Sequence, residues 1–280
     1  MLRSILVALD DTPGAIAARD VAIALARRTG ATLTAAAVLD RPHTQDPHEA
    51  VPAGGGAFKE RRDAALARRA RQEAEAAFAA CATAAGTQAF EPLLLEDAPE
   101  PALLSACVEH DLIVLGRDCT LGLEENEDGV APVIQALLKD AARPLLVVPP
   151  GTAAGSAPQG EVLVGYDGSL PAMRALQLFA LLGLHEGRAV RVLSIGETAA
   201  AAQAVAEPAA AYLRCHGMEA GAIGAVDASP GDALLAEAAR RPTGLMVAGA
   251  YGTTGLRAFF FGSTTQSLLR DAPCPLFVHH

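Results

Sequence analysis

Short apolar runs alternate with longer amphipathic stretches along the chain. Residues 5–9 (Ile-Leu-Val-Ala-Leu) form a continuous apolar run that ends at Asp10. Residues 15–28 follow with helical spacing of apolar positions, and residues 32–39 form the next apolar run. Short continuous runs are typical of strands buried on both faces, and stretches of ten or more residues are long enough for helices. The pattern predicts βαβ units and a parallel sheet.

The same pattern occurs a second time. Residues 162–166 form an apolar run that ends at Asp167, and a helical stretch and another apolar run follow at 171–182 and 189–195. Later segments also match in pairs: 111–116 with 244–249, and 143–148 with 274–278. An internal repeat of this kind predicts two domains of similar fold in one chain.

The first half is the longer one, and its extra residues lie between the second strand and Pro99. Residues 40–58 are rich in Pro, Gly and His and indicate a surface loop, while 59–85 form an Ala-rich helical stretch whose charges indicate a solvated face. Residues 150–160 are mostly Pro, Gly and small residues and predict a linker. We therefore expect domains at 1–149 and 161–280.

Composition limits the functions that this chain can have. Of its 280 residues, 51% are hydrophobic and 19% are charged, which excludes general disorder. The net charge of −10 argues against a nucleic-acid partner, and the absence of Trp argues against a platform for stacked bases. No apolar run reaches the roughly 18 residues of a membrane span, and no signal peptide is evident, so we expect a cytoplasmic protein without a membrane partner.

Cysteine and histidine give no sign of a metal centre. The five cysteines are scattered and form no C-x-x-C pair, so neither a disulfide framework nor a zinc site is predicted. His43 and His48 are too isolated to indicate a metal site. We also find no set of residues that predicts a catalytic centre.

A glycine-rich segment in the second half carries the clearest chemistry. Gly249 and Gly252 are followed, after nine residues, by Gly262 and Ser263. Glycines let the backbone approach a phosphate closely, and a new helix presents unpaired N–H groups to an anion. Glycine in a turn and serine as a helix N-cap would explain the same residues without a ligand. The spacing is neither the dinucleotide fingerprint nor the P-loop.

The whole chain resembles a tandem universal stress protein, whose adenine-nucleotide motif is G-x-x-G-x(9)-G-[ST]. The resemblance implies two doubly wound parallel sheets of the adenine-nucleotide α-hydrolase type, five strands each in the order 3-2-1-4-5. It implies ATP, with or without Mg²⁺, in the second half. It also implies pairing of the two halves through their last strands, residues 144–148 and 275–278, with further dimerisation of whole chains left open.

The resemblance also names the residues that would hold the nucleotide. The adenosine side would be lined by Gly165, Tyr166 and Asp167, and the backbone of Ile195 would meet the adenine. The phosphates and ribose would be held by Gly249, Gly252, Gly262, Ser263 and Thr264. From its place after the first strand, Asp167 could accept from a ribose hydroxyl or help to hold a metal on the phosphates.

The first half departs from this motif. It keeps Gly116 and Gly129, but Cys119 replaces the second glycine and Val130 replaces the hydroxyl residue. Its loop is acidic, with carboxylates that would repel a triphosphate: Glu124, Glu125, Glu127 and Asp128. We therefore expect one nucleotide per chain, and a structural or regulatory first half.

Three functions remain open at this point. The leading interpretation is an ATP-binding stress-response sensor or regulator without enzymatic activity beyond a weak ATPase. An enzyme related to the adenine-nucleotide α-hydrolases is the second, although no general base can be assigned beside Asp167. A nucleotide-free scaffold or chaperone-like stress protein is the third.

Overall fold

The computed structural model describes residues 1–41, 55–121, 130–153, 160–250 and 262–280. The first half contains β1 (Ser4–Ala8), α1 (Pro13–Thr29), β2 (Thr32–Val38), α3 (Gly56–Ala85), β3 (Glu91–Leu95), α4 (Pro99–Ala106), β4 (Leu112–Gly116), α5 (Pro132–Asp140) and β5 (Leu145–Val148). The second half contains β6 (Glu161–Gly165), α6 (Leu170–Leu182), β7 (Val190–Ile195), α7 (Ala199–Cys215), β8 (Ala220–Ala225), α8 (Pro230–Arg240), β9 (Thr243–Gly249), α9 (Ser263–Asp271) and β10 (Leu276–His279).

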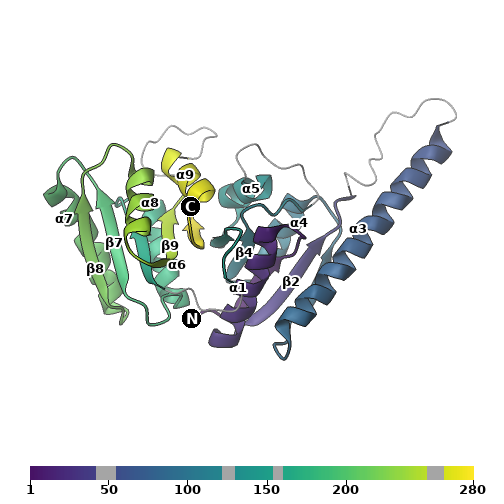
Figure 1. The fold of residues 1–280 in the computed structure, drawn as a ribbon, viewed down its shortest axis with the longest axis horizontal. Helices are drawn as coiled ribbons and strands as arrows, with labels where there is room; N and C mark the ends of the chain where they lie inside the picture. Colours follow the sequence, from purple (N-terminus) through teal and green to yellow (C-terminus); the bar gives the residue numbers. More distant parts are fainter. Residues whose placement is uncertain (42–54, 122–129, 154–159, 251–261) are drawn as a thin grey trace.

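The strands form one ten-stranded sheet in the order β3-β2-β1-β4-β5-β10-β9-β6-β7-β8. Each half therefore has the order 3-2-1-4-5, and its neighbouring strands are parallel. Helices lie on both faces of the sheet (Figure 1). The predicted tandem α/β fold is confirmed, including its strand order.

The two halves meet at β5 and β10, which are antiparallel. Leu276 pairs with Val147, Phe277 with Leu146, and Val278 with Leu145. These are apolar strands, and left unpaired they would expose edges prone to aggregation. The expected pairing of the last strands is confirmed, and it occurs within one chain.

Alternating strand residues build two core layers that both run through the two halves. On β1, Ile5 and Val7 face the layer that α1 and α6 cover, whereas Leu6 faces the layer that α5 and α9 cover. In the first layer Phe179 of α6 meets Phe277 of β10 edge to face, with ring centroids 6.3 Å apart. The hydrophobic contact between the halves is therefore continuous with the core of each half.

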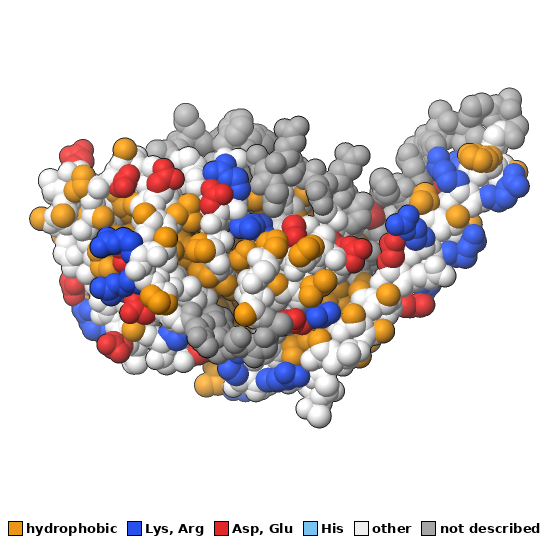
Figure 2. All heavy atoms as spheres, viewed as in Figure 1, with side chains coloured by type: hydrophobic (Ala, Val, Ile, Leu, Met, Phe, Trp, Pro, Cys, Tyr) orange, Lys and Arg blue, Asp and Glu red, His pale blue; other side chains and the backbone are white. Residues whose placement is uncertain are grey.

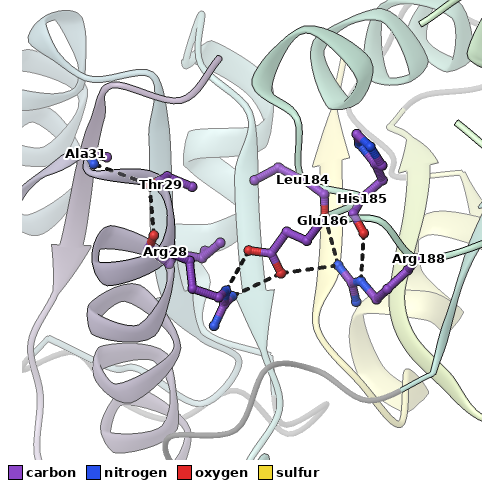
Figure 3. A network of polar contacts seen from close by, with 8 residues as sticks. Arg28, Thr29, Ala31, Leu184, His185, Glu186 and Arg188 are labelled. Atoms are coloured by element: carbon purple, nitrogen blue, oxygen red, sulfur yellow. Dashed lines mark hydrogen bonds and ion pairs between the residues drawn. The ribbon is translucent and has the colours of Figure 1, made fainter. Parts of the chain in front are cut away.

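A polar contact also joins the halves, between the end of α1 and the turn that leads from α6 to β7 (Figure 3). Arg28, in the last turn of α1, donates from Nε to Glu186 Oε1 at 2.7 Å and from Nη2 to Glu186 Oε2 at 3.1 Å. Arg188 donates to the carbonyls of Leu184 and His185, and so holds the turn that presents Glu186. Beside this contact, the N–H of Leu2 donates to the carbonyl of Leu182 at 3.1 Å.

Helix α3 covers the outer strands of the first half and then extends past the sheet (Figure 1). It starts at Gly56, three residues before the predicted start at Lys59. Its buried residues, Ala74, Cys81 and Ala85, all lie in the later part of the helix. Basic side chains gather along the projecting part (Figure 2). Among the described helices, none is long and apolar enough to cross a membrane.

Candidate functional site

The predicted site residues that the structure describes in the second half lie at one edge of its sheet. Because β7, β6 and β9 are parallel neighbours, their carboxyl ends lie side by side. Asp167 follows β6, Ile195 ends β7 and Gly249 ends β9. Ligands of open α/β sheets bind at such an edge, near the point where the strand order reverses. Here the order reverses between β6 and β9, since the chain runs outward from β6 through β7 to β8 on one side and from β9 to β10 on the other.

The turn between β6 and α6 is shaped by its own side chains. Asp167 Oδ1 accepts from the N–H of Ser169 at 2.9 Å, and Gly168 adopts φ +77°. Ser169 then caps α6 by accepting from the N–H of Ala172 at 3.3 Å. The Asp167 residue is exposed, and among the described residues its carboxylate bonds only within this turn. The second carboxylate oxygen therefore points to a ligand or to solvent rather than to the protein.

Tyr166 and Gly165 are both half-buried at the end of β6. The carbonyl of Tyr166 accepts from the hydroxyl of Ser194, a buried residue of β7, at 2.5 Å. Burial raises the pKa of the Tyr166 phenol, and the neighbouring carboxylate of Asp167 adds to the effect. The phenol therefore stays protonated at neutral pH and can donate a hydrogen bond. The sequence did not predict that Ser194 holds the backbone of Tyr166 in this way.

Gly249 has a packing role that its sequence motif does not reveal. A Cβ atom at this position would lie 2.5 Å from the backbone nitrogen of Ala172, at the start of α6. The same relationship holds in the first half, where a Cβ at Gly116 would lie 2.2 Å from the nitrogen of Ala15. Glycine at the end of the fourth strand therefore lets the first helix approach the sheet, whether or not a ligand binds nearby.

The N-terminus of α9 lies next to this glycine. Thr265 is buried, and its hydroxyl donates to the carbonyl of Gly249 at 3.4 Å. Ser263 is exposed and Thr264 is half-buried, so two further hydroxyls lie in the first turn. Gly262 precedes the helix without a side chain that could cap it. No described side chain caps the first N–H groups, and these groups, with the positive end of the helix dipole, suit an anion. Gly252 lies within residues 251–261, outside the described residues.

Ile195 is the last residue of β7, as expected, and its half-buried side chain packs against the core. Among the described residues, no group of three His, Cys, Asp or Glu side chains could hold a metal ion.

The corresponding edge of the first half is closed by its own chain. Asp10 accepts from the N–H of Leu121 at 2.9 Å and from the hydroxyl of Thr120 at 3.3 Å. Cys119, Leu121 and Val130 are all buried, and burial raises the pKa of the Cys119 thiol well above its usual value. The four carboxylates that we expected to repel a nucleotide lie outside the described residues. Apolar side chains nevertheless fill this strand end.

The first turns of the equivalent helices also differ. Helix α5 begins with Pro132, Val133 and Ile134, of which Val133 and Ile134 are buried. Proline has no N–H to offer, and none of the three carries a hydroxyl. Helix α9 begins with Ser263, Thr264 and Thr265 instead. The two halves share a fold but present opposite chemistry at the same place.

Comparison with known proteins agrees with the fold. A family model described as the universal stress protein family matches residues 1–149 and 160–280. No protein with a curated description matches the chain. A universal stress protein from Archaeoglobus fulgidus DSM 4304 is similar over 99% of this chain and 97% of its own, with a TM-score of 0.72 and 16% identity. A candidate universal stress protein from Pseudomonas aeruginosa UCBPP-PA14 is similar over 99% and 93%, with a TM-score of 0.56 and 16% identity. At 16% identity, these solved structures support the fold alone.

Proposed function

We propose that this chain, which belongs to the universal stress protein family, binds one adenine nucleotide in its second half and acts as a sensor or regulator. ATP is the nucleotide that the motif favours. In the same proposal, residues 1–149 form a structural or regulatory domain without nucleotide, 150–160 form a linker, and 161–280 form the binding domain.

The contrast between α9 and α5 is the observation that carries this proposal. Both helices follow the fourth strand of their half, yet α9 opens with three hydroxyl residues and no side-chain cap. Helix α5 opens with a proline and two buried apolar residues. An anion gains from exposed N–H groups and hydroxyls at a helix N-terminus, whereas an apolar first turn offers it nothing.

In this proposal each residue has a limited task. Ser263 and Thr264 donate to phosphate oxygens, and Gly252 and Gly262 keep the intervening backbone close to them. Asp167 accepts from a ribose hydroxyl, because its outer oxygen is free of the turn that uses its Oδ1. Gly165, Tyr166 and the backbone of Ile195 line the adenosine side. Gly249 acts by letting α6 and β9 approach each other.

The residues named above bind the nucleotide and carry out no chemical step on it. Among the described residues, no histidine or second carboxylate bonds to Asp167, so no general base is placed beside a water molecule on the phosphates. Turnover of bound ATP would therefore need groups beyond those named here.

Calorimetric titration of the full chain with ATP and Mg²⁺ tests the proposal. We expect the titration to show one ATP site per chain. We also expect mass spectrometry to detect adenine nucleotide released when the freshly purified protein is denatured. Gly252→Val should abolish binding, because a side chain would enter the phosphate loop. Ser263→Ala should weaken binding by about 1–3 kcal/mol through loss of a hydrogen bond to a charged oxygen.

Ser267→Ala is the matched control, since Ser267 lies one turn further along α9, away from its N-terminus. Two equivalent sites per chain would contradict the closure of the first half. Unchanged affinity in Gly252→Val would show that the site is wrongly placed, and no binding at millimolar ATP would favour the nucleotide-free scaffold.

A further inference from the structure

A pocket lies in the first half, far along the sheet from the proposed nucleotide site. It has a volume of about 180 Å³ and lies where α3 leaves the sheet. Its lining comes from α3, from the segment after β2 and from the segment after β3: Leu39, Arg41, Ala67, Arg68, Ala70, Arg71 and Glu96. The N–H of Leu39 donates to the carbonyl of Leu95 at 2.7 Å, which holds the two strand ends together beneath the pocket.

The pocket combines an apolar floor with a positive rim. Leu39 is buried and belongs to a small core cluster against which Ala70 packs. Among the described residues that line the pocket, three carry a guanidinium group and one, Glu96, carries a carboxylate. These described lining residues carry an excess of two positive charges, in a chain whose net charge is −10.

Glu96 orients two of these arginines and leaves the third. Its Oε2 forms an ion pair with Arg41, and its Oε1 accepts from Arg71 Nη2 at 3.1 Å. Arg68 lies one turn before Arg71 on the same helix. Within the part of the chain that the structure describes, Arg68 forms no ion pair and no side-chain hydrogen bond. Its donors are thus available to a ligand.

We propose that this pocket binds a small phosphomonoester that carries one ring or a short apolar chain. A guanidinium group matches the geometry of phosphate oxygens through paired N–H donors, and several arginines suit a dianion. A phosphomonoester carries about −1.5 to −2 charges at neutral pH, which balances the excess of two in the pocket. Sites for drug-sized ligands measure about 300–1,000 Å³, so a pocket of 180 Å³ suits a smaller molecule. The apolar floor takes the stem of that molecule.

Titration calorimetry of the full chain with phenyl phosphate at low ionic strength tests this inference. Inorganic phosphate, benzoate and phenol serve as probes that each keep only part of the proposed chemistry. We expect phenyl phosphate to bind more tightly than any of the three. Arg68→Gln should lower its affinity by about tenfold or more, as removal of a charged hydrogen bond does.

Arg69→Gln is the matched control, because Arg69 is the next residue of the helix, 78% exposed at its side chain, and pairs with Glu73 rather than with Glu96. The affinity of Arg69→Gln for phenyl phosphate should stay within about twofold of that of the unchanged chain. Equal losses in Arg68→Gln and Arg69→Gln would overturn the proposal by indicating general charge attraction. If both variants bound phenyl phosphate as tightly as the unchanged chain, the proposal would also be overturned, since the ligand would then bind elsewhere.

A second measurement does not depend on a variant. In ¹H–¹⁵N spectra of the unchanged chain, phenyl phosphate should shift side-chain Nε–Hε signals of arginines, and Arg68→Gln should remove one shifted signal. Shifts confined to backbone signals of α9 would assign the ligand to the nucleotide site and would overturn this proposal without affecting the other.

Discussion

Arg191 joins four elements of the second half through one guanidinium group. The residue lies on β7 and is 5% exposed. It forms ion pairs with Glu161 of β6 and with Glu237 of α8, and it donates to the hydroxyl of Thr243 on β9 at 3.1 Å. Each partner comes from a different element, so the guanidinium fixes α8 against the three strands.

Replacing Arg191 should therefore cost more than replacing an exposed partner of the same carboxylate. We expect Arg191→Met to lower the free energy of unfolding by about 2–4 kcal/mol, because it removes the buried partner of Glu161 and Glu237 and leaves them only exposed arginines. Arg240 also pairs with Glu237, but its side chain is 79% exposed. Arg240→Met should change the free energy of unfolding by about 0.5 kcal/mol or less. Chemical denaturation measures both, and equal losses would show that the burial of Arg191 is unimportant.

Gly249 and Gly221 provide a second pair of matched substitutions. A Cβ at Gly249 would meet backbone atoms of α6, which cannot move aside without shifting the helix. Gly249→Ala should lower the free energy of unfolding by about 1–3 kcal/mol or more. A Cβ at Gly221, on β8, would meet nothing within 4 Å. Gly221→Ala should raise stability by up to about 1 kcal/mol, since alanine restricts the unfolded chain. Thermal unfolding distinguishes the two, and destabilisation of similar size in both would contradict the role of close packing.

The residue scale is also where sequence-based prediction is weakest. Asp10 and Asp167 could be placed at strand ends because an apolar run stops at each of them. The closure of the first half could not be foreseen, because Leu121 turns inward from a loop with φ +53°, a conformation that its residue type disfavours. Ser194 and Thr265 escape notice for a related reason. Their hydroxyls bond to backbone carbonyls of neighbouring strands, and no spacing along the chain indicates such partners.

At the scale of elements, periodicity predicts nearly everything. The apolar runs 5–9, 32–39 and 189–195 correspond to β1, β2 and β7. Helix α1 begins two residues earlier than expected, since Thr12 caps it and Pro13 fits the first turn. Helix α3 was the least constrained by its pattern, because alanine suits both its packed and its solvated positions.

The two parts of α3 should differ in local stability. Its later part is anchored by Ala74, Cys81 and Ala85, whereas residues 56–72 contain no buried side chain. Most of the stability of a helix in a protein comes from packing of one face against the rest of the fold, and residues 56–72 have little such packing. We expect amides of 57–72 to exchange with solvent much faster than those of 75–85 in hydrogen-exchange mass spectrometry.

Helix α1 is the internal reference for that experiment, because buried residues occur along most of its length. Its amides should be as protected as those of the later part of α3, or more. Uniform protection along α3 would mean that another group covers its projecting part in solution.

At the scale of the whole molecule, we expect the shared sheet to make the two halves unfold together. Both core layers cross the junction of β5 and β10, and Phe277 is completely buried there. We expect a single calorimetric unfolding transition for the chain. Phe277→Ala should lower its stability by about 3–5 kcal/mol, because it leaves a cavity against Phe179.

The variant should lower hydrogen-exchange protection of β1 and β6 together, although Phe277 belongs to the second half. Two separate transitions in the unchanged chain would contradict this view. So would loss of protection restricted to the second half in Phe277→Ala. In either case the antiparallel pairing would be a contact between independent domains.

The junction of β5 and β10 within a single polypeptide has a consequence for how mutations affect the two domains. In a dimer of identical subunits, every mutation in the gene appears in both subunits, so neither strand end can change alone. Here Leu121 and Cys119 close one strand end, while the other keeps Ser263 and Thr264. Two similar domains in one polypeptide can therefore change separately, so that apolar side chains close one strand end while the other keeps its hydroxyl groups.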